Sequence, residues 1–183
     1  MNSCCSSAMD GQFGKSVARS ELRVYRRRGP FHTTRAIIDT VRQHGASRAS
    51  LLDIGGGIGV LHHELLGEVV DTAIQVDPAS AFIAEARAEC ERRGHAEAVR
   101  FIQGDFVDLA EDLPEADIVT LDRVICCYPD YRRLVVASAA KARKLYAFSY
   151  LREKWYVKAV IGIQNAFRRL RGSAFRTYVH PTR

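Results

Sequence analysis

Hydrophobic positions in this sequence follow two spacings that alternate along the chain. Short apolar runs, typical of buried parallel strands, are separated by segments in which apolar residues recur at helical spacing. The predicted strands are Ser50–Ile54, Thr72–Asp77, Val99–Gln103, Asp117–Leu121 and Leu145–Tyr150. Strands that alternate with helices predict an α/β fold, with a Rossmann-like, doubly wound, mostly parallel sheet covered by helices on both faces.

Helical spacing predicts the elements between and around these strands. The predicted helices span residues 15–28, about 33–45, 58–66, 79–93, 130–142 and 153–171. Thr33 or Thr34 is a suitable N-cap for the second of them. The apolar face of the last helix consists of Tyr156, Val160, Ile163, Phe167 and Leu170.

The length of the chain suits one domain with a sizeable core. We predict a flexible tail at residues 1–14 and a single cofactor-binding domain at residues 15–183. Its predicted parts are N-terminal helices at 15–45, a core at 50–151, and a C-terminal helix and tail at 153–183.

A glycine-rich turn follows the first predicted strand. Asp53 lies near the end of that strand, and Gly55, Gly56, Gly57 and Gly59 come next. Glycine lets a ligand approach the backbone and adopts φ values that strain other residues. The spacing is Gly-x-Gly-x-Gly, and valine follows the last glycine, so the dinucleotide fingerprint Gly-x-Gly-x-x-Gly is not completed. The turn predicts a nucleoside cofactor site.

Acidic residues follow the next three predicted strands as well. Asp77 ends the second strand, Asp105 follows the third, and Asp122 follows the fourth. Each acid alone is more often a helix cap, and a lone glycine cluster is often only a tight turn. In an open α/β sheet, however, the carboxyl ends of the strands meet at one crevice. The combination therefore predicts carboxylates that accept hydrogen bonds from ribose hydroxyls and an adenine amino group.

The glycine turn with these acids resembles class I S-adenosylmethionine (SAM) methyltransferases over residues 50–150. The resemblance implies SAM as the cofactor. It also implies that Asp53 and the glycines line the methionine end, that Asp77 binds ribose, and that Asp105 and Phe106 flank adenine. The implied cofactor-binding residues are Asp53, Gly55, Gly56, Gly57, Gly59, Asp77, Pro78, Gly104, Asp105, Phe106, Leu121 and Asp122.

Three further segments are similar to bacterial magnesium-protoporphyrin O-methyltransferases: residues 121–130 with 148–150, residues 25–29, and residues 175–181. This similarity implies a small-molecule acceptor that is methylated on oxygen. The candidate acceptor-binding residues are Tyr25, Arg123, Cys126, Cys127, Tyr128, Tyr150 and Arg152. The arginines are as well explained by internal ion pairs, and Tyr25 and the two cysteines by packing. No residue is identified as catalytic, because a carboxylate acceptor needs no base.

The family's sheet normally gains two strands after the last helix, and this sequence departs from that pattern. Only 12 residues follow Arg171, too few for the two strands. We therefore expect a sheet that lacks the last two strands and has an unpaired edge at the fifth. An exposed edge predicts self-association of the isolated chain.

The charge of the chain permits other readings. The net charge is 27 − 21 = +6, but the basic residues are scattered, so we expect no nucleic-acid partner. The Asn/Asp-Pro-Pro-aromatic segment of enzymes that methylate exocyclic amines is not found after the fourth strand. A nucleic-acid methyltransferase and a non-catalytic SAM-binding protein stay as alternatives, and a NAD-dependent oxidoreductase is a distant one.

The cysteines and apolar runs indicate the compartment. Neither Cys4-Cys5 nor Cys126-Cys127 has the Cys-x-x-Cys spacing of a zinc site, so we expect reduced thiols and no metal site. No apolar run reaches the ~18–20 residues of a membrane span, and the N-terminus has no apolar signal core. These features predict a cytoplasmic protein without a membrane span.

Overall fold

The computed structural model of the protein describes residues 14–45, 47–173 and 175–181. Its sheet has five strands in the order β3-β2-β1-β4-β5, and every adjacent pair is parallel. The strands are β1 (Ala49–Ile54), β2 (Val70–Asp77), β3 (Val99–Gln103), β4 (Ala116–Leu121) and β5 (Ala142–Phe148). The predicted Rossmann-like α/β fold is confirmed. All but the last residue of the predicted tail, residues 1–14, lies outside the described residues.

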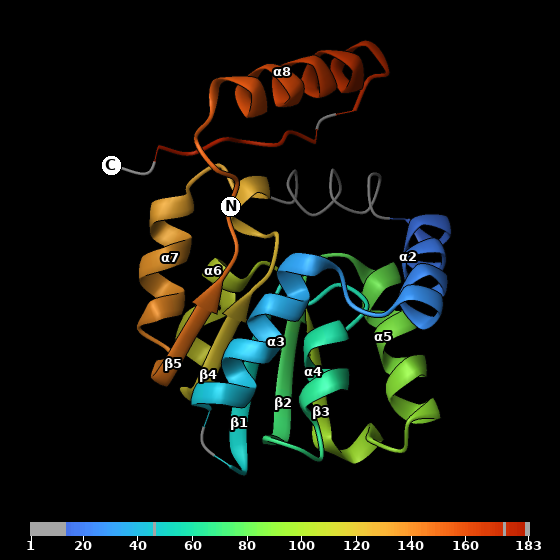
Figure 1. Cartoon of the computed structure of the whole chain (residues 1–183), viewed down its shortest axis with the longest axis vertical. Helices are drawn as coiled ribbons and strands as arrows, with labels where there is room; N and C mark the ends of the chain where they lie inside the picture. The colour runs from blue at the N-terminus through green and yellow to red at the C-terminus, as the bar shows by residue number, and fades with distance from the viewer. Residues whose placement is uncertain (1–13, 46, 174, 182–183) are drawn as a thin grey trace.

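Helices cover both faces of this sheet (Figure 1). They are α2 (Lys15–Arg28), α3 (His32–His44), α4 (Val60–Leu65), α5 (Ser80–Arg92), α6 (Phe106–Leu109), α7 (Tyr131–Ala139) and α8 (Trp155–Leu170). Three short 3-10 helices lie in the connections between helices and strands: η1 (Ala96–Ala98), η2 (Ala110–Asp112) and η3 (Ile125–Cys127).

Predicted boundaries were wrong at helix α3 and at strand β5, among others. Helix α3 begins at His32 with Phe31 as its N-cap, so neither Thr33 nor Thr34 caps it. Strand β5 begins at Ala142, which pairs with Ala116, although residue 142 was predicted to be the last of the preceding helix. Pairing along β4 therefore outweighs the local helical preference of this alanine-rich segment.

The central strand β1 explains why the first apolar run is continuous. Leu51 packs in a cluster with α3, α4 and α5, whereas Leu52 packs in a cluster with α6 and α7. Since neighbouring side chains of a strand point to opposite faces, both faces of β1 must be apolar. A third cluster packs α2 against the start of α5 and the glycine turn through Leu22, Tyr25 and Phe82.

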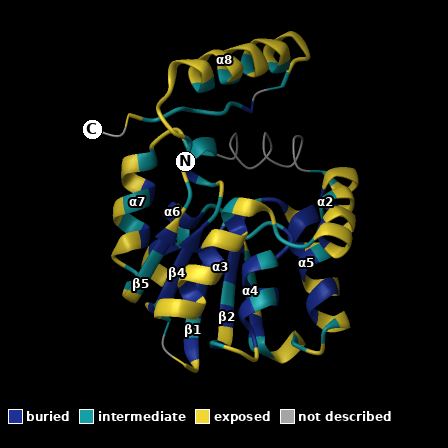
Figure 2. Cartoon of the chain, in the orientation of Figure 1, coloured by how far each residue is buried: buried dark blue, intermediate teal, exposed yellow. Residues whose placement is uncertain are grey.

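Helix α8 lies across the carboxyl ends of the strands and buries none of its residues (Figures 1 and 2). Its predicted apolar face exists but is open to solvent, since Ile163 is 72% exposed and Leu170 is 86% exposed. Within the described residues, no strand follows α8, and β5 pairs only with β4. None of the described helices is long and apolar enough to cross a membrane.

Candidate functional site

The glycine turn between β1 and α4 follows a path that only glycine adopts without strain. Gly55, Gly57 and Gly59 have φ values of 63°, 56° and 81°, in the left-handed region. A Cβ atom at Gly55 would lie 2.5 Å from a methyl group of Val124, and one at Gly59 would lie 2.4 Å from the ring of His62. The sequence therefore needs glycine here for two reasons, backbone conformation and close packing.

Asp77 and Gln75 hold this turn in place from the neighbouring strand β2. The N–H of Gly57 donates to Asp77 Oδ2 at 2.9 Å, and Gln75 Nε2 donates to the carbonyl oxygen of Gly57 at 2.7 Å. Asp77 Oδ1 also accepts the N–H of Ala79 at 2.8 Å. Burial raises the pKa of Asp77 to about 6, against the lowering effect of these two N–H donors. Sequence reasoning missed Gln75, although a single amide within a buried apolar strand was the available signal.

Asp53 lies buried at the end of β1, beside the same turn. Thr120 Oγ1 donates to Asp53 Oδ1 at 3.0 Å, whereas Asp53 Oδ2 has no hydrogen-bond partner among the described residues. Burial raises the pKa of Asp53 to about 7. Gln75 Oε1 is likewise buried without a partner in the described chain. Buried acceptors without donors are costly, so these two oxygens fit a bound group that brings its own hydrogen-bond donors.

We expect Asp53→Asn to change the pH dependence of stability. A carboxyl whose pKa is raised in the folded state keeps its proton there between its ordinary pKa of 3.8 and about 7, where the unfolded chain has released it. This contribution to stability is present at low pH and is lost as the pH rises through that range. The free energy of unfolding of the variant relative to the wild type should therefore increase from pH 5 to pH 7.

Urea unfolding at the two pH values measures this difference. Asp71→Asn is the control, because Asp71 belongs to the same sheet but forms a surface ion pair with Arg48. A difference between Asp53→Asn and wild type that does not change with pH would contradict the assigned shift.

Asp105 joins the end of β3 to the segment after β4. Its Oδ1 accepts the N–H of Val107 at 2.9 Å, which caps α6, and the hydroxyl of Tyr128 donates to both carboxylate oxygens at 3.0 and 3.1 Å. The hydrogen bonds of Tyr128 thus connect the segment after β4 to the segment after β3. Phe106 packs in the core and is 4% exposed. Its contact with an adenine ring, like the remaining cofactor contacts at Pro78, Gly104 and Leu121, stays a prediction.

Asp122 and Arg123 form a second junction, between α3, β4 and the end of β5. Thr34 and Ser149 donate to the two carboxylate oxygens of Asp122 at 2.5 and 2.6 Å. Arg123 has a left-handed φ of 60°, and its side chain lies near Asp122 and near Glu21, at 3.6 and 3.9 Å. Of the two roles considered for Arg123, acceptor binding and an internal ion pair, the structure shows the ion pair. Sequence reasoning missed Thr34 and Ser149 because their partner lies on another element.

A cavity of about 270 Å³ lies beside η3 and β5. It is lined by Ile125, Cys126, Tyr131, Val135, Phe148, Tyr150, Leu151, Tyr178, His180 and Pro181. Two predicted acceptor residues, Cys126 and Tyr150, thus share one cavity with the C-terminal segment, which sequence reasoning did not place there. The N–H of Tyr178 donates to the carbonyl oxygen of Cys126 at 2.7 Å and holds the segment in position.

Other predicted acceptor residues lie elsewhere. Tyr25 is buried between α2 and α4, where its hydroxyl donates to Glu64 at 2.5 Å and accepts from Arg93 at 2.7 Å. Arg152 is exposed and does not line the cavity. Cys127 Sγ lies 3.7 Å from Cys126 Sγ. Roles for these three residues in acceptor binding stay predictions.

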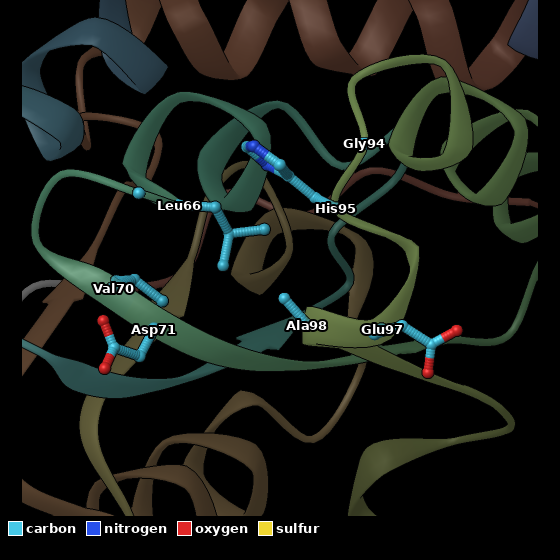
Figure 3. A pocket seen from close by; sticks show the side chains of 8 residues that line it. Leu66, Val70, Asp71, Gly94, His95, Glu97 and Ala98 are labelled. Carbon is cyan, nitrogen blue, oxygen red and sulfur yellow. The ribbon is translucent and has the colours of Figure 1, made fainter.

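A larger cavity, of about 390 Å³, lies at the opposite end of the sheet (Figure 3). Val70 and Asp71, at the start of β2, form one wall, and Gly94, His95, Glu97 and Ala98 form the other. Ligands of open α/β sheets bind at the carboxyl ends of the strands, so this cavity is distinct from the site formed by the glycine turn.

Comparison with known proteins agrees with this geometry. The family described as "Methyltransferase domain" matches residues 51–144, about half of the chain. The YcgJ protein from Bacillus subtilis is 26% identical, with a TM-score of 0.58, and the match covers 79% of this chain and 61% of that one. No curated protein matches the sequence significantly.

Two further solved structures share the fold at lower identity. Magnesium protoporphyrin IX methyltransferase from Synechocystis, solved with bound S-adenosylhomocysteine (SAH), is 18% identical with a TM-score of 0.62, and the match covers 82% of this chain and 66% of that one. An O-methyltransferase family protein from Burkholderia thailandensis is 16% identical with a TM-score of 0.68, and the match covers 95% and 54%. The chain spans less than two thirds of the length of these three proteins.

Proposed function

Because the chain belongs to the methyltransferase domain family and its cofactor is SAM, we propose that it transfers a methyl group from SAM to an oxygen atom of a small-molecule acceptor. One observation carries the proposal. The left-handed glycine turn and the carboxylate of Asp77 are joined by a 2.9 Å hydrogen bond at the carboxyl ends of β1 and β2. The glycine turn and Asp77 therefore lie next to each other, as the predicted cofactor site requires.

The chain's own residues suit the two ends of this cofactor. Asp53 Oδ2 and Gln75 Oε1 are buried acceptors without donors in the described chain, beside the turn where the amino-acid end is expected. Asp77 and Asp105 would accept hydrogen bonds from ribose and adenine, because each carboxylate oxygen has lone pairs beyond those used by the backbone. When bound, SAM supplies a methyl group that its sulfonium has already activated.

What the protein must add is mainly alignment of the acceptor. Holding two reactants in line contributes up to ~7–11 kcal/mol to lowering a barrier. The cavity beside η3 supports a small acceptor, since its volume of about 270 Å³ is just below the usual range of ligand pockets, roughly 300–1,000 Å³. Four aromatic residues line it: Tyr131, Phe148, Tyr150 and Tyr178. This lining favours a planar and largely apolar acceptor.

His180 is the residue in this cavity that could accept a proton from a hydroxyl acceptor. Its Nε2 lies 3.0 Å from the carbonyl oxygen of Ile125 and 3.1 Å from that of Tyr128, so Nε2 carries the hydrogen. Nδ1 then carries the lone pair. The ring also stacks on Tyr131, with centroids 4.2 Å apart, which fixes its plane.

We expect His180→Gln to lower methyl transfer to a hydroxyl acceptor by about 100-fold, the lower range for a general base, and to leave SAH affinity unchanged. Steady-state rates with the identified acceptor and calorimetry with SAH measure the two effects. His44→Gln, at the end of α3 away from the cavity, is the matched control. Equal rates for His180→Gln and wild type would exclude His180 as the base.

Two measurements test the proposed function itself. Titration calorimetry with SAM, SAH and NAD should show binding of the first two only. Incubation with SAM that carries a tritiated methyl group and with fractionated metabolites should then give a labelled small molecule. Binding of NAD alone would overturn the cofactor assignment. Binding of SAM without labelled product in any fraction would indicate a non-catalytic SAM-binding protein, and labelled RNA would indicate a nucleic-acid methyltransferase.

A further inference from the structure

A cluster of two histidines and a cysteine packs against the glycine turn but has no part in the proposed reaction. His62 and His63 belong to α4, and Cys90 belongs to α5. All three side chains are buried, and one ring nitrogen from each histidine and the Cys90 sulfur lie within 4.8 Å of one another. Two imidazoles and a thiol form a donor set that borderline-soft transition metals such as Zn²⁺ prefer.

The histidine rings lack the hydrogen bonds that normally accompany burial. Within the described chain, both nitrogens of His62 and Nδ1 of His63 are buried without a hydrogen-bond partner. His62 has 0% of its surface exposed, so bulk solvent does not reach its ring nitrogens. An ordinary core histidine is paired, because an unpaired buried polar atom costs roughly 1–3 kcal/mol. The cluster therefore has the features of a ligand set.

The contact on the other side of the His63 ring fits metal coordination. His63 Nε2 lies 3.1 Å from the carbonyl oxygen of Ile58, so it carries the hydrogen and leaves Nδ1 with a lone pair. Metal-bound histidines usually donate their second N–H to a backbone carbonyl or a carboxylate in this way. His62 Nδ1 lies 3.6 Å from Asp53 Oδ2, which is too long for a hydrogen bond, so both nitrogens of His62 are without a partner in the described chain.

The large cavity at the amino ends of the strands is separated from the cluster by His95 and Leu66, which line it (Figure 3). Cys90 Sγ donates to the carbonyl oxygen of His95 at 3.3 Å. The ring of His95 points away from Asp71 and Glu97 in Figure 3, and its Nδ1 is buried without a partner among the described residues. Structural zinc sites have four ligands, and His95 or a water molecule would supply the fourth.

We propose that His62, His63 and Cys90 bind one Zn²⁺ ion, or another borderline-soft divalent ion, in a structural site that clamps α4 to α5 beneath the glycine turn. Zinc–nitrogen bonds of about 2.0 Å and a zinc–sulfur bond of about 2.3 Å require the three donor atoms to approach by roughly 1 Å. The sequence predicted no metal, because no local spacing joins Cys90 to the histidines. The packing of α5 against α4 and the sheet brings them together.

Cobalt substitution tests the site on the full chain without an affinity tag, after dialysis against a chelator. Co²⁺ titration should saturate at one ion per chain and produce a thiolate-to-cobalt charge-transfer band, and Zn²⁺ should remove that band by displacement. Cys90→Ser should lose the band. The double variant Cys126→Ser/Cys127→Ser is the matched control and should keep it, since both of these thiols lie in η3.

A measurement on the wild type alone decides the question if Cys90→Ser does not fold. X-ray absorption at the zinc edge should show one sulfur and two or three nitrogen ligands. The proposal is overturned if the wild type gives no charge-transfer band at saturating Co²⁺, if the band persists in Cys90→Ser, or if two sulfur ligands are found.

Discussion

Replacing Asp77 with alanine is expected to weaken SAH binding by about 100-fold or more. The substitution leaves the N–H groups of Gly57 and Ala79 without their acceptor and frees the glycine turn from β2. Each unpaired donor costs about 1–3 kcal/mol, and 1.4 kcal/mol corresponds to tenfold in affinity. The proposed ribose contact is lost as well. Titration calorimetry at pH 7 measures the change.

Asp71→Ala is the control for this prediction. Asp71 lies on the same strand, near its opposite end, and its side chain pairs with Arg48 at the surface. Its replacement should leave SAH affinity within about twofold of wild type, because exposed ion pairs contribute 0–1 kcal/mol. An Asp77→Ala protein that is folded by circular dichroism and binds SAH as the wild type does would refute the role of Asp77.

The largest loss of stability is expected for Glu89→Ala. Glu89 is fully buried and accepts five hydrogen bonds of 2.6–3.0 Å from the side chains of three arginines: Arg26, Arg92 and Arg93. Removing one partner of a buried ion pair costs about 3–5 kcal/mol, but these arginines are partly exposed and water can solvate them again. We therefore expect a loss of about 2–3 kcal/mol in the free energy of unfolding.

The effect of Glu89→Ala should depend on pH. The hydrogen bonds from Arg92 lower the pKa of Glu89 below its ordinary value of 4.5, against the raising effect of burial. A lowered carboxyl pKa stabilises the folded state above the unfolded value and loses this effect as the pH falls. The difference between wild type and variant should therefore narrow below about pH 4.5, as measured by urea unfolding.

Glu85→Ala provides the comparison for Glu89. Glu85 lies one turn earlier on α5 and forms a single pair with Arg19, whose side chain is 68% exposed. This variant should lose less than about 1 kcal/mol. Similar losses for the two variants would show that the three-arginine arrangement adds nothing beyond an ordinary surface pair.

The fold could be predicted from the sequence because the pattern of apolar residues was unambiguous. Both faces of β1 are buried, so its apolar run is continuous, and the strand–helix alternation leaves few other topologies. The positions of Asp53, Asp77 and Asp105 at strand ends followed from the same pattern. Their hydrogen-bond partners did not, since Thr120, Gln75 and Tyr128 are neighbours of these acids only in the folded chain.

The cavity proposed to bind the acceptor was harder to predict from the sequence than the glycine turn. The cavity combines η3, the end of β5 and the C-terminal segment, which have no common periodicity in the sequence. Helix α8 shows the converse case. Its apolar spacing predicted a packed face, but periodicity records which residues share a side of a helix and not whether another element covers that side.

The C-terminal segment is attached to the fold separately from the glycine turn and the acids at the strand ends. The N–H of Tyr178 and the ring of His180 contact backbone carbonyl oxygens of η3 and of Tyr128, whereas Asp53 and Asp77 belong to β1 and β2. Under the proposed function, we expect substitutions at residues 175–181 to change acceptor selectivity with little effect on SAM binding.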